Sequence, residues 1–178
     1  MRISHNSITA IISAALVVIL FDGCGGGGSE TSSGGSSGNL NVYLTDAPTD
    51  EVSSVNVYIT GLTVKRSGAS VERISDDVGL IDLLTLQDST QLIAVANVQP
   101  GNYEFIMVEL DQSRSSVVEK SSGSTLPLKI PSQEIKVLGG FVVQAEGQTD
   151  VVLDFDAGKS LVKLGNKNWL LKPVIVKK

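Results

Sequence analysis

The stretch Leu40-Asn41-Val42-Tyr43-Leu44-Thr45 decides the fold class of this chain. Aliphatic side chains occupy every second position, and this period of two predicts a β-strand with one buried face. The turn residues Asp46-Ala47-Pro48-Thr49-Asp50 follow directly and end the strand. A strand with one buried face is therefore the unit from which we expect the domain to be built.

The same alternation, or a short apolar run between turn residues, recurs along the rest of the chain. Further strands are expected at 55–64, 71–74, 80–84, 103–110, 116–119, 125–130, 135–143, 148–155, 161–164 and 169–176. Residues 85–96 show no clear period, and a loop with a helical turn is one interpretation of them. Many short strands with scarcely any helical periodicity predict an all-β antiparallel sandwich over residues 39–178. A closed barrel fits less well, because the strands vary in length.

Glycine and proline add detail to this prediction. Gly61 and the pair Gly139-Gly140 interrupt strand patterns and predict bulges. Pro127 and Pro131 predict that the strand at 125–130 lies at a sheet edge, because proline cannot donate to a ladder on both sides. The strand at 103–110 is long and has no such interruption, and we expect it to be central.

The first 23 residues have the parts of an export signal. A polar start that carries Arg2 precedes a largely apolar run of 14 residues at 8–21, shorter than the roughly 20 residues that span a bilayer as a helix. Cys24 follows the small Gly23 directly, which resembles bacterial lipoprotein signals. The resemblance implies cleavage before Cys24 and attachment of diacylglycerol to its thiol, in the outer membrane if the cell has one and otherwise at the cell surface. The alternative is an ordinary secretory signal with an incidental cysteine.

Residues 24–38 are almost entirely Gly and Ser after the cysteine, a composition that predicts a flexible linker. Such a linker would hold the domain at roughly 20 Å from the membrane on average. Loss of the signal removes one basic and one acidic residue, Arg2 and Asp22, so the net charge stays at −5. An acidic domain without a basic block does not suit nucleic acid as a partner. The acyl chains on Cys24 are therefore the expected contact with the membrane.

Catalysis is not expected, because the residue types that it most often needs are missing. The single histidine, His5, lies in the signal, and the single cysteine, Cys24, is the expected lipidation site. Serine or cysteine nucleophiles activated by histidine, and zinc sites with nitrogen or sulfur ligands, are thereby excluded from the mature chain. Without a disulfide, the fold must be stabilised by apolar burial.

Three acidic residues form the candidate metal site. Asp46 ends the first strand, and Asp154 and Asp156 share one face of a late strand. Carboxylate oxygens suit calcium, which needs neither histidine nor cysteine. The structural alternative is that Asp46 accepts backbone hydrogen bonds in a turn, while Asp154 and Asp156 face water or pair with Lys159 and Lys163.

Three aromatic residues are candidates for ligand binding. Tyr43 and Tyr58 lie opposite the aliphatic rows of their strands, and with Trp169 they could form a platform on which a sugar stacks. The alternative is that the tyrosines only pack on the outer face of a sheet and that Trp169 covers the edge of the core. Tyr103 is expected in the core, with its hydroxyl bonded to nearby backbone.

Five stretches together resemble a prokaryotic lipoprotein family known as domain of unknown function 4382: residues 40–48, 100–103, 138–141, 152–162 and 171–173. A second resemblance, carried by Pro100-Gly101-Asn102-Tyr103, is to transthyretin-like and carbohydrate-binding sandwich modules, and it implies a transthyretin-like or immunoglobulin-like architecture. The first family implies no activity. We therefore expect a lipid-anchored, non-catalytic envelope domain that binds a glycan or a protein. The alternative is an assembly component that pairs through an exposed strand, either beside Pro127 or at 71–74.

Overall fold

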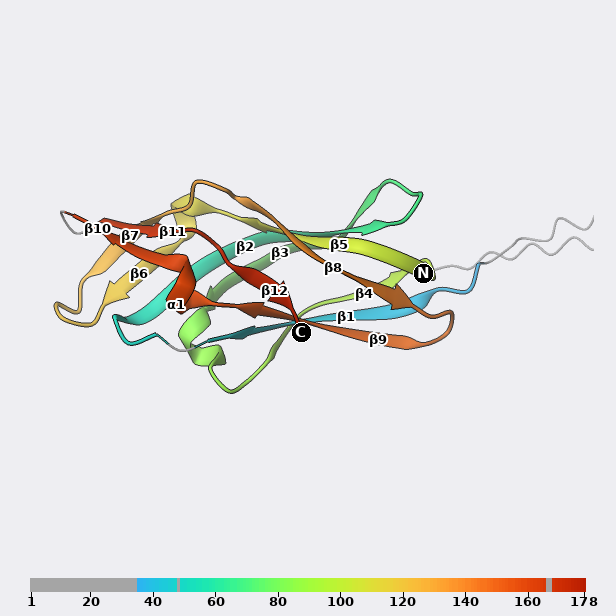
Figure 1. Ribbon diagram of the computed structural model, residues 1–178, viewed down its shortest axis with the longest axis horizontal. Coiled ribbons are helices and arrows are strands. Elements are labelled where there is room, and N and C mark those ends of the chain that lie inside the picture. Colours follow the sequence, from blue (N-terminus) through green and yellow to red (C-terminus); the bar gives the residue numbers. More distant parts are fainter. Residues whose placement is uncertain (1–34, 48, 166–167) are drawn as a thin grey trace, which may run out of the picture. The chain divides into compact units, whose positions relative to one another are not determined.

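The alternating stretches form two β-sheets that pack face to face in the computed structural model, which describes residues 35–47, 49–165 and 168–178 (Figure 1). One sheet has four strands in the order β12-β9-β1-β4. Their bounds are β1 (Gly38–Asp46), β4 (Gln91–Val98), β9 (Gln148–Phe155) and β12 (Ile175–Lys177). The chain is thus the predicted all-β sandwich, although β1 and β9 run parallel.

The other sheet has eight strands in the order β10-β11-β7-β6-β2-β5-β8, with β3 paired to β2. Their bounds are β2 (Val52–Arg66), β3 (Val71–Asp82), β5 (Gly101–Leu110), β6 (Ser116–Glu119), β7 (Thr125–Lys129), β8 (Glu134–Val143), β10 (Leu161–Leu164) and β11 (Asn168–Leu171). Short helices η1 (Leu83–Leu86), η2 (Gln112–Arg114) and α1 (Ala157–Ser160) connect strands. None of the helices in the described part of the chain is long and apolar enough to cross a membrane.

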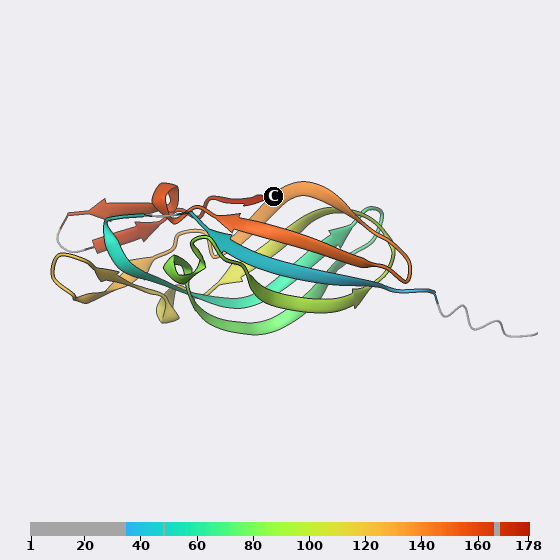
Figure 2. The same ribbon diagram turned by 90° about the horizontal axis from the view of Figure 1, so that it is seen from below.

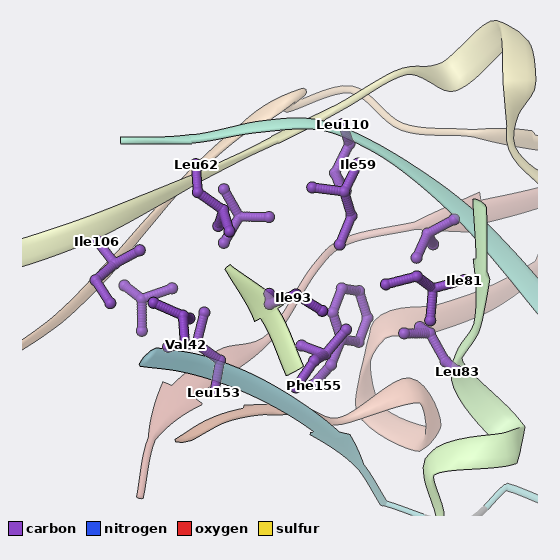
Figure 3. Close-up of a cluster of buried hydrophobic side chains, with 14 of the residues drawn as sticks. Val42, Ile59, Leu62, Ile81, Leu83, Ile93, Ile106, Leu110, Leu153 and Phe155 are labelled. Carbon is purple, nitrogen blue, oxygen red and sulfur yellow. The ribbon is translucent and has the colours of Figure 1, made fainter. Parts of the chain in front are cut away.

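The core lies between the two sheets and consists of the aliphatic rows that the sequence pattern predicts. Val42 from β1, Leu153 from β9, and Leu62 and Ile106 from the larger sheet point toward one another (Figure 3). Each is at most 2% exposed. Tyr103 is buried as predicted, and its hydroxyl donates to the carbonyl of Gln99 at 2.7 Å. Apolar burial from both sheets thus stabilises the sandwich.

At two positions in the larger sheet, two short strands lie end to end and together take the place of one long strand. β5 and β6 lie along the same side of β2, where they pair with residues 59–66 and 52–56 respectively, and η2 separates them. β8 and β7 follow the same two strands on their other side. β5 therefore lies between β2 and β8, which confirms its predicted central position.

β11 continues the larger sheet only part of the way. It pairs in parallel with β7 through Trp169 and Leu170, and the chain then leaves this sheet at Pro173. β12 joins β9 in the smaller sheet (Figure 2). The single strand predicted at 169–176 is thus two strands in different sheets.

Three other expectations about the strands differ from the structure in part. Residues 71–84 hold one long strand, β3, and the start of η1, where two short strands were expected. Residues 85–96 contain the end of η1, which agrees with the expected helical turn, and most of β4, which that interpretation missed. β7 lies between β6 and β11, but β11 pairs only with Leu128 and Lys129, so the predicted edge is confined to residues 125–127. Pro127 is tolerated there because the ladder with β11 begins at Leu128.

Candidate functional site

The three candidate metal ligands lie near one another, yet each has a separate structural contact. The parallel register places Asp46 beside Phe155 on the core side, and Asp154 beside Thr45 on the outer side. Oδ1 of Asp46 accepts from the N–H of Ala157 at 2.8 Å, at the start of α1. Among the described residues, no group of three or more His, Cys, Asp or Glu side chains is arranged to hold a metal ion. Calcium binding stays a prediction.

The other two carboxylates are paired with lysines. Asp156 accepts from the backbone N–H of Lys159 at 2.9 Å and from its Nζ at 2.6 Å, so it caps α1. Oδ2 of Asp154 lies 3.0 Å from Nζ of Lys178. Lys163, the other predicted partner, bonds Glu119 instead. The structural alternative for these residues thus agrees with the geometry, apart from Lys163.

Asp46 is the electrostatically unusual member of the group. Its side chain is buried, and Oδ2 has no hydrogen-bond partner in the described structure. Burial raises the pKa of Asp46 to about 7; the hydrogen bond from Ala157 opposes this rise, and the negative charges of Asp156 and Asp154 add to it. The protonated form is therefore favoured in mildly acidic solution.

The predicted aromatic platform does not form. Trp169 is fully buried, so it cannot present a face to a sugar. The guanidinium of Arg114 lies 3.4 Å from the ring centroid of Tyr58, whose hydroxyl donates to Asp77 at 2.6 Å. Tyr43 is half-buried on β1, in the other sheet. The three residues therefore share no surface.

A cleft of about 440 Å³ lies where β11 leaves the larger sheet. Leu171, Lys172 and Pro173 form one side of it. Pro131, Ser132 and the first three residues of β8 form the other side. No sequence pattern predicted this cleft, because it depends on the point at which the last strands change sheets.

The cleft opens onto an unpaired edge of β8. β8 pairs with β5 on one side, and no strand of the described structure pairs with it on the other. The accessible part of this edge ends at Gly139, where Lys177 of β12 lies close: its Cε is 3.5 Å from the position that a Cβ on Gly139 would take. We call residues 134–138 the open edge.

The hydrogen-bond pattern shows which groups the open edge offers. Leu110 N–H donates to the carbonyl of Gln133 at 2.7 Å, and the next opposed residues are Glu109 and Glu134. Opposed residues of an antiparallel pair alternately share hydrogen bonds or aim their backbone groups outward. Glu134, Lys136 and Leu138 therefore direct their N–H and C=O groups away from β5, toward the open edge.

The side chains of the same three residues lie on the outer face of the sheet and are exposed, Leu138 by 69%. Ile135 and Val137 between them face the core. Nζ of Lys136 lies 4.4 Å from the ring centroid of Phe105 on β5. The open edge thus combines free backbone groups with a row of one acidic, one basic and one apolar side chain.

Comparison with known proteins identifies a family for this chain. The family model for a domain of unknown function, DUF4382, matches residues 37–173. No curated protein matches. A solved structure from Bacteroides fragilis, described as a "putative cell adhesion protein", is 10% identical, with a TM-score of 0.34; the likeness covers 80% of this chain and 45% of that one. The chain thus spans less than half of that protein's length, and this likeness carries no functional argument.

Proposed function

The chain belongs to the DUF4382 family, and from that premise we propose that it is a lipid-anchored, non-catalytic envelope module that binds a protein partner by adding an extended segment to the open edge of β8. The observation that carries this proposal is the run of outward backbone groups at Glu134, Lys136 and Leu138 beside the 440 Å³ cleft. Strand addition obtains affinity from such groups and specificity from the alternating side chains.

The other sheet edges are less suited to a partner strand. Charged residues protect β3, which carries Glu72, Arg73, Asp76 and Asp77 and pairs irregularly with β2. β10 and β12 have only four and three residues. β4 is uncharged, but its ladder with β1 is bulged at Ile93, and a bulge disturbs the row of groups that a partner would need. Strand pairing, the alternative that the sequence suggested, thus moves from Pro127 and residues 71–74 to β8.

A glycan ligand has less support, because the aromatic residues that suggested it are dispersed. Lipid anchoring remains supported by the sequence alone, since Cys24 lies outside the described residues. Both points can be tested in the same cells. A glycan adduct would be sensitive to glycosidase, and lipid labelling should be lost in Cys24→Ser.

The test is site-specific photo-crosslinking of the full chain in its own envelope. A photoreactive residue at Leu138 should give one discrete protein adduct, whereas the same residue at Leu80 of β3, 57% exposed, should give none. Equal adducts from both positions, or none from Leu138, would contradict the proposal.

Proline substitution tests whether the partner uses the backbone edge. Lys136→Pro removes an outward N–H and leaves the ladder with β5 intact, so it should abolish the Leu138 adduct while the protein stays folded. Lys136→Ala also removes the side-chain charge but keeps that N–H; it is the matched control, and it should still give the adduct, at a yield lowered by no more than a few-fold. Val137→Pro removes a ladder hydrogen bond and should lower the melting temperature. Retention of the adduct in folded Lys136→Pro would rule out strand addition.

A further inference from the structure

We infer that the open edge selects its segment by charge order: the captured strand presents a basic, an acidic and an apolar side chain opposite Glu134, Lys136 and Leu138. This inference rests on the proposed function and deepens it, because it states which chemistry the partner segment carries. The geometry on which it depends is that the three residues place both their side chains and their free backbone groups along one line.

An added strand has its side chains in register with those of β8. Residues opposite each other in neighbouring strands have Cβ atoms about 5 Å apart, and residues two positions along share the same face. The residues opposite Glu134, Lys136 and Leu138 therefore all lie on the outer face. The residues between them face Ile135 and Val137, which belong to the apolar interior.

The charges on both sides of the cleft favour a carboxylate near its centre. Lys136 lies on one wall and Lys172 on the other. Neither forms an ion pair with a described residue, and neither does Lys177 at the far end of the open edge. An acidic side chain opposite Lys136 would thus gain a partner on the edge and a second across the cleft.

The two other positions have equally definite preferences. Among the described residues, Glu134 is the only acidic one that lines the cleft, and an acidic residue directly opposite it would be repelled. Leu138 is 69% exposed beside the half-buried Phe105, its register partner on β5. An apolar residue opposite Leu138 would cover both side chains. The expected segment is thus basic–x–acidic–x–apolar or its reverse in chain direction, with small apolar residues at x.

Two peptides of identical composition test this order. One carries Leu-Ala-Glu-Ala-Lys between neutral flanks, and the other carries Leu-Ala-Lys-Ala-Glu, so only the positions of the two charges differ. Each is made in both chain directions, and its tighter direction is used. Binding to the full chain, purified as the cell produces it, is measured by fluorescence anisotropy at low salt. We expect the first peptide to bind about tenfold more tightly, since each cross-strand charge pair changes affinity by a few-fold.

Charge exchange on the protein supplies the control. Glu134→Lys combined with Lys136→Glu should reverse the preference between the peptides without changing the net charge. The matched variant Glu104→Lys with Lys129→Glu changes two exposed residues that do not line the cleft, and it should leave the preference unchanged.

Equal binding of the two peptides, no binding of either at millimolar concentration, or a preference that survives the charge exchange would overturn the inference. The proposed function would then still stand if the Leu138 adduct forms in cells and Lys136→Pro removes it. Only failure of the crosslinking experiment would overturn the proposed function. The peptide experiment and the crosslinking experiment therefore test the charge order and the proposed function independently.

Discussion

Asp46 shows how a single buried carboxylate can make stability depend on pH. Its pKa is about 7 in the folded protein and near 3.8 when the chain is unfolded. As pH rises, the unfolded chain loses this proton at about pH 4, whereas the folded protein keeps it until about pH 7. The free energy of unfolding therefore falls as pH rises from about 4 to about 7 and then levels off. The difference corresponds to at most about 4 kcal/mol.

Substitution of Asp46 by Asn should remove this dependence. The amide oxygen can still accept from the N–H of Ala157, but the group no longer titrates. Chemical denaturation of both proteins between pH 5 and pH 8 is the measurement. The wild-type free energy of unfolding should decrease over this range, whereas that of Asp46→Asn should be nearly constant and exceed the wild-type value at pH 8.

Other acidic residues do not explain such a slope. Hydrogen bonds from Ser113 and Arg114 lower the pKa of Asp111 to about 2. Hydrogen bonds from Lys159 lower the pKa of Asp156. These two groups contribute stability that is lost only as pH falls below about 4. A slope between pH 5 and pH 8 that persists in Asp46→Asn would therefore show that Asp46 is not its source.

The strands β2, β3 and β5 are joined on their outer face by an arginine that depends on a glycine. The guanidinium of Arg73 on β3 crosses over Gly61 on β2 and bonds both carboxylate oxygens of Glu109 on β5 at 2.7 Å. A Cβ at Gly61 would lie 2.0 Å from Nη2 of Arg73. The predicted bulge at Gly61 is confirmed by a shift in the register between β2 and β5. The missing side chain of Gly61 also leaves room for the guanidinium of Arg73.

Gly61→Ala should displace the Arg73 side chain and lower the melting temperature. Arg73→Ala should lower it too, and in that background Gly61→Ala should have little further effect, because the obstructed group is gone. Thermal denaturation of the two single variants and the double variant is the measurement. Additive losses would mean that Gly61 acts independently of Arg73.

Strand predictions succeeded where the alternation of side chains is local and regular. β1, β5 and β9 were read correctly because one face of each contacts the core at every second residue. β4 was missed because its bulge places Ile93 and Ala94 both on the buried side, while Leu92 and Val95 are exposed. This arrangement breaks the period of two within four residues.

The candidate site could not be predicted from any single stretch. The open edge exists because β11 leaves its sheet at Pro173 while β8 continues, and this relation joins residues about 35 positions apart in the sequence. The pairing of Trp169 with Leu128 is equally long-range, so the sequence left open whether this tryptophan faces a ligand or covers the core, and the structure shows that it is buried. The carboxylates were placed near one another correctly, but their individual partners depend on α1 and on Lys178.

At the scale of the whole molecule, the contacts of the three carboxylates predict how calcium affects stability. Both oxygens of Asp156 are bonded to Lys159, so calcium could use all three carboxylates only by displacing this lysine, and the described residues form no group arranged to hold a metal ion. We expect the melting temperature to be the same with millimolar calcium as with a chelator. A rise with calcium that is lost in Asp154→Asn would instead establish the metal site that the sequence suggested.

The parallel pairing of β1 with β9 also sets the order in which this chain can fold. β1 begins at Gly38 and its partner β9 begins at Gln148, so the two inner strands of the smaller sheet cannot pair until most of the domain is available. Closing so long a loop is slow, because its entropy is lost before the contacts form. A protein that crosses a membrane through a narrow channel must remain unfolded until it has passed. If this chain is exported as we propose, its strand order would keep the sandwich open until most of the domain has crossed the membrane.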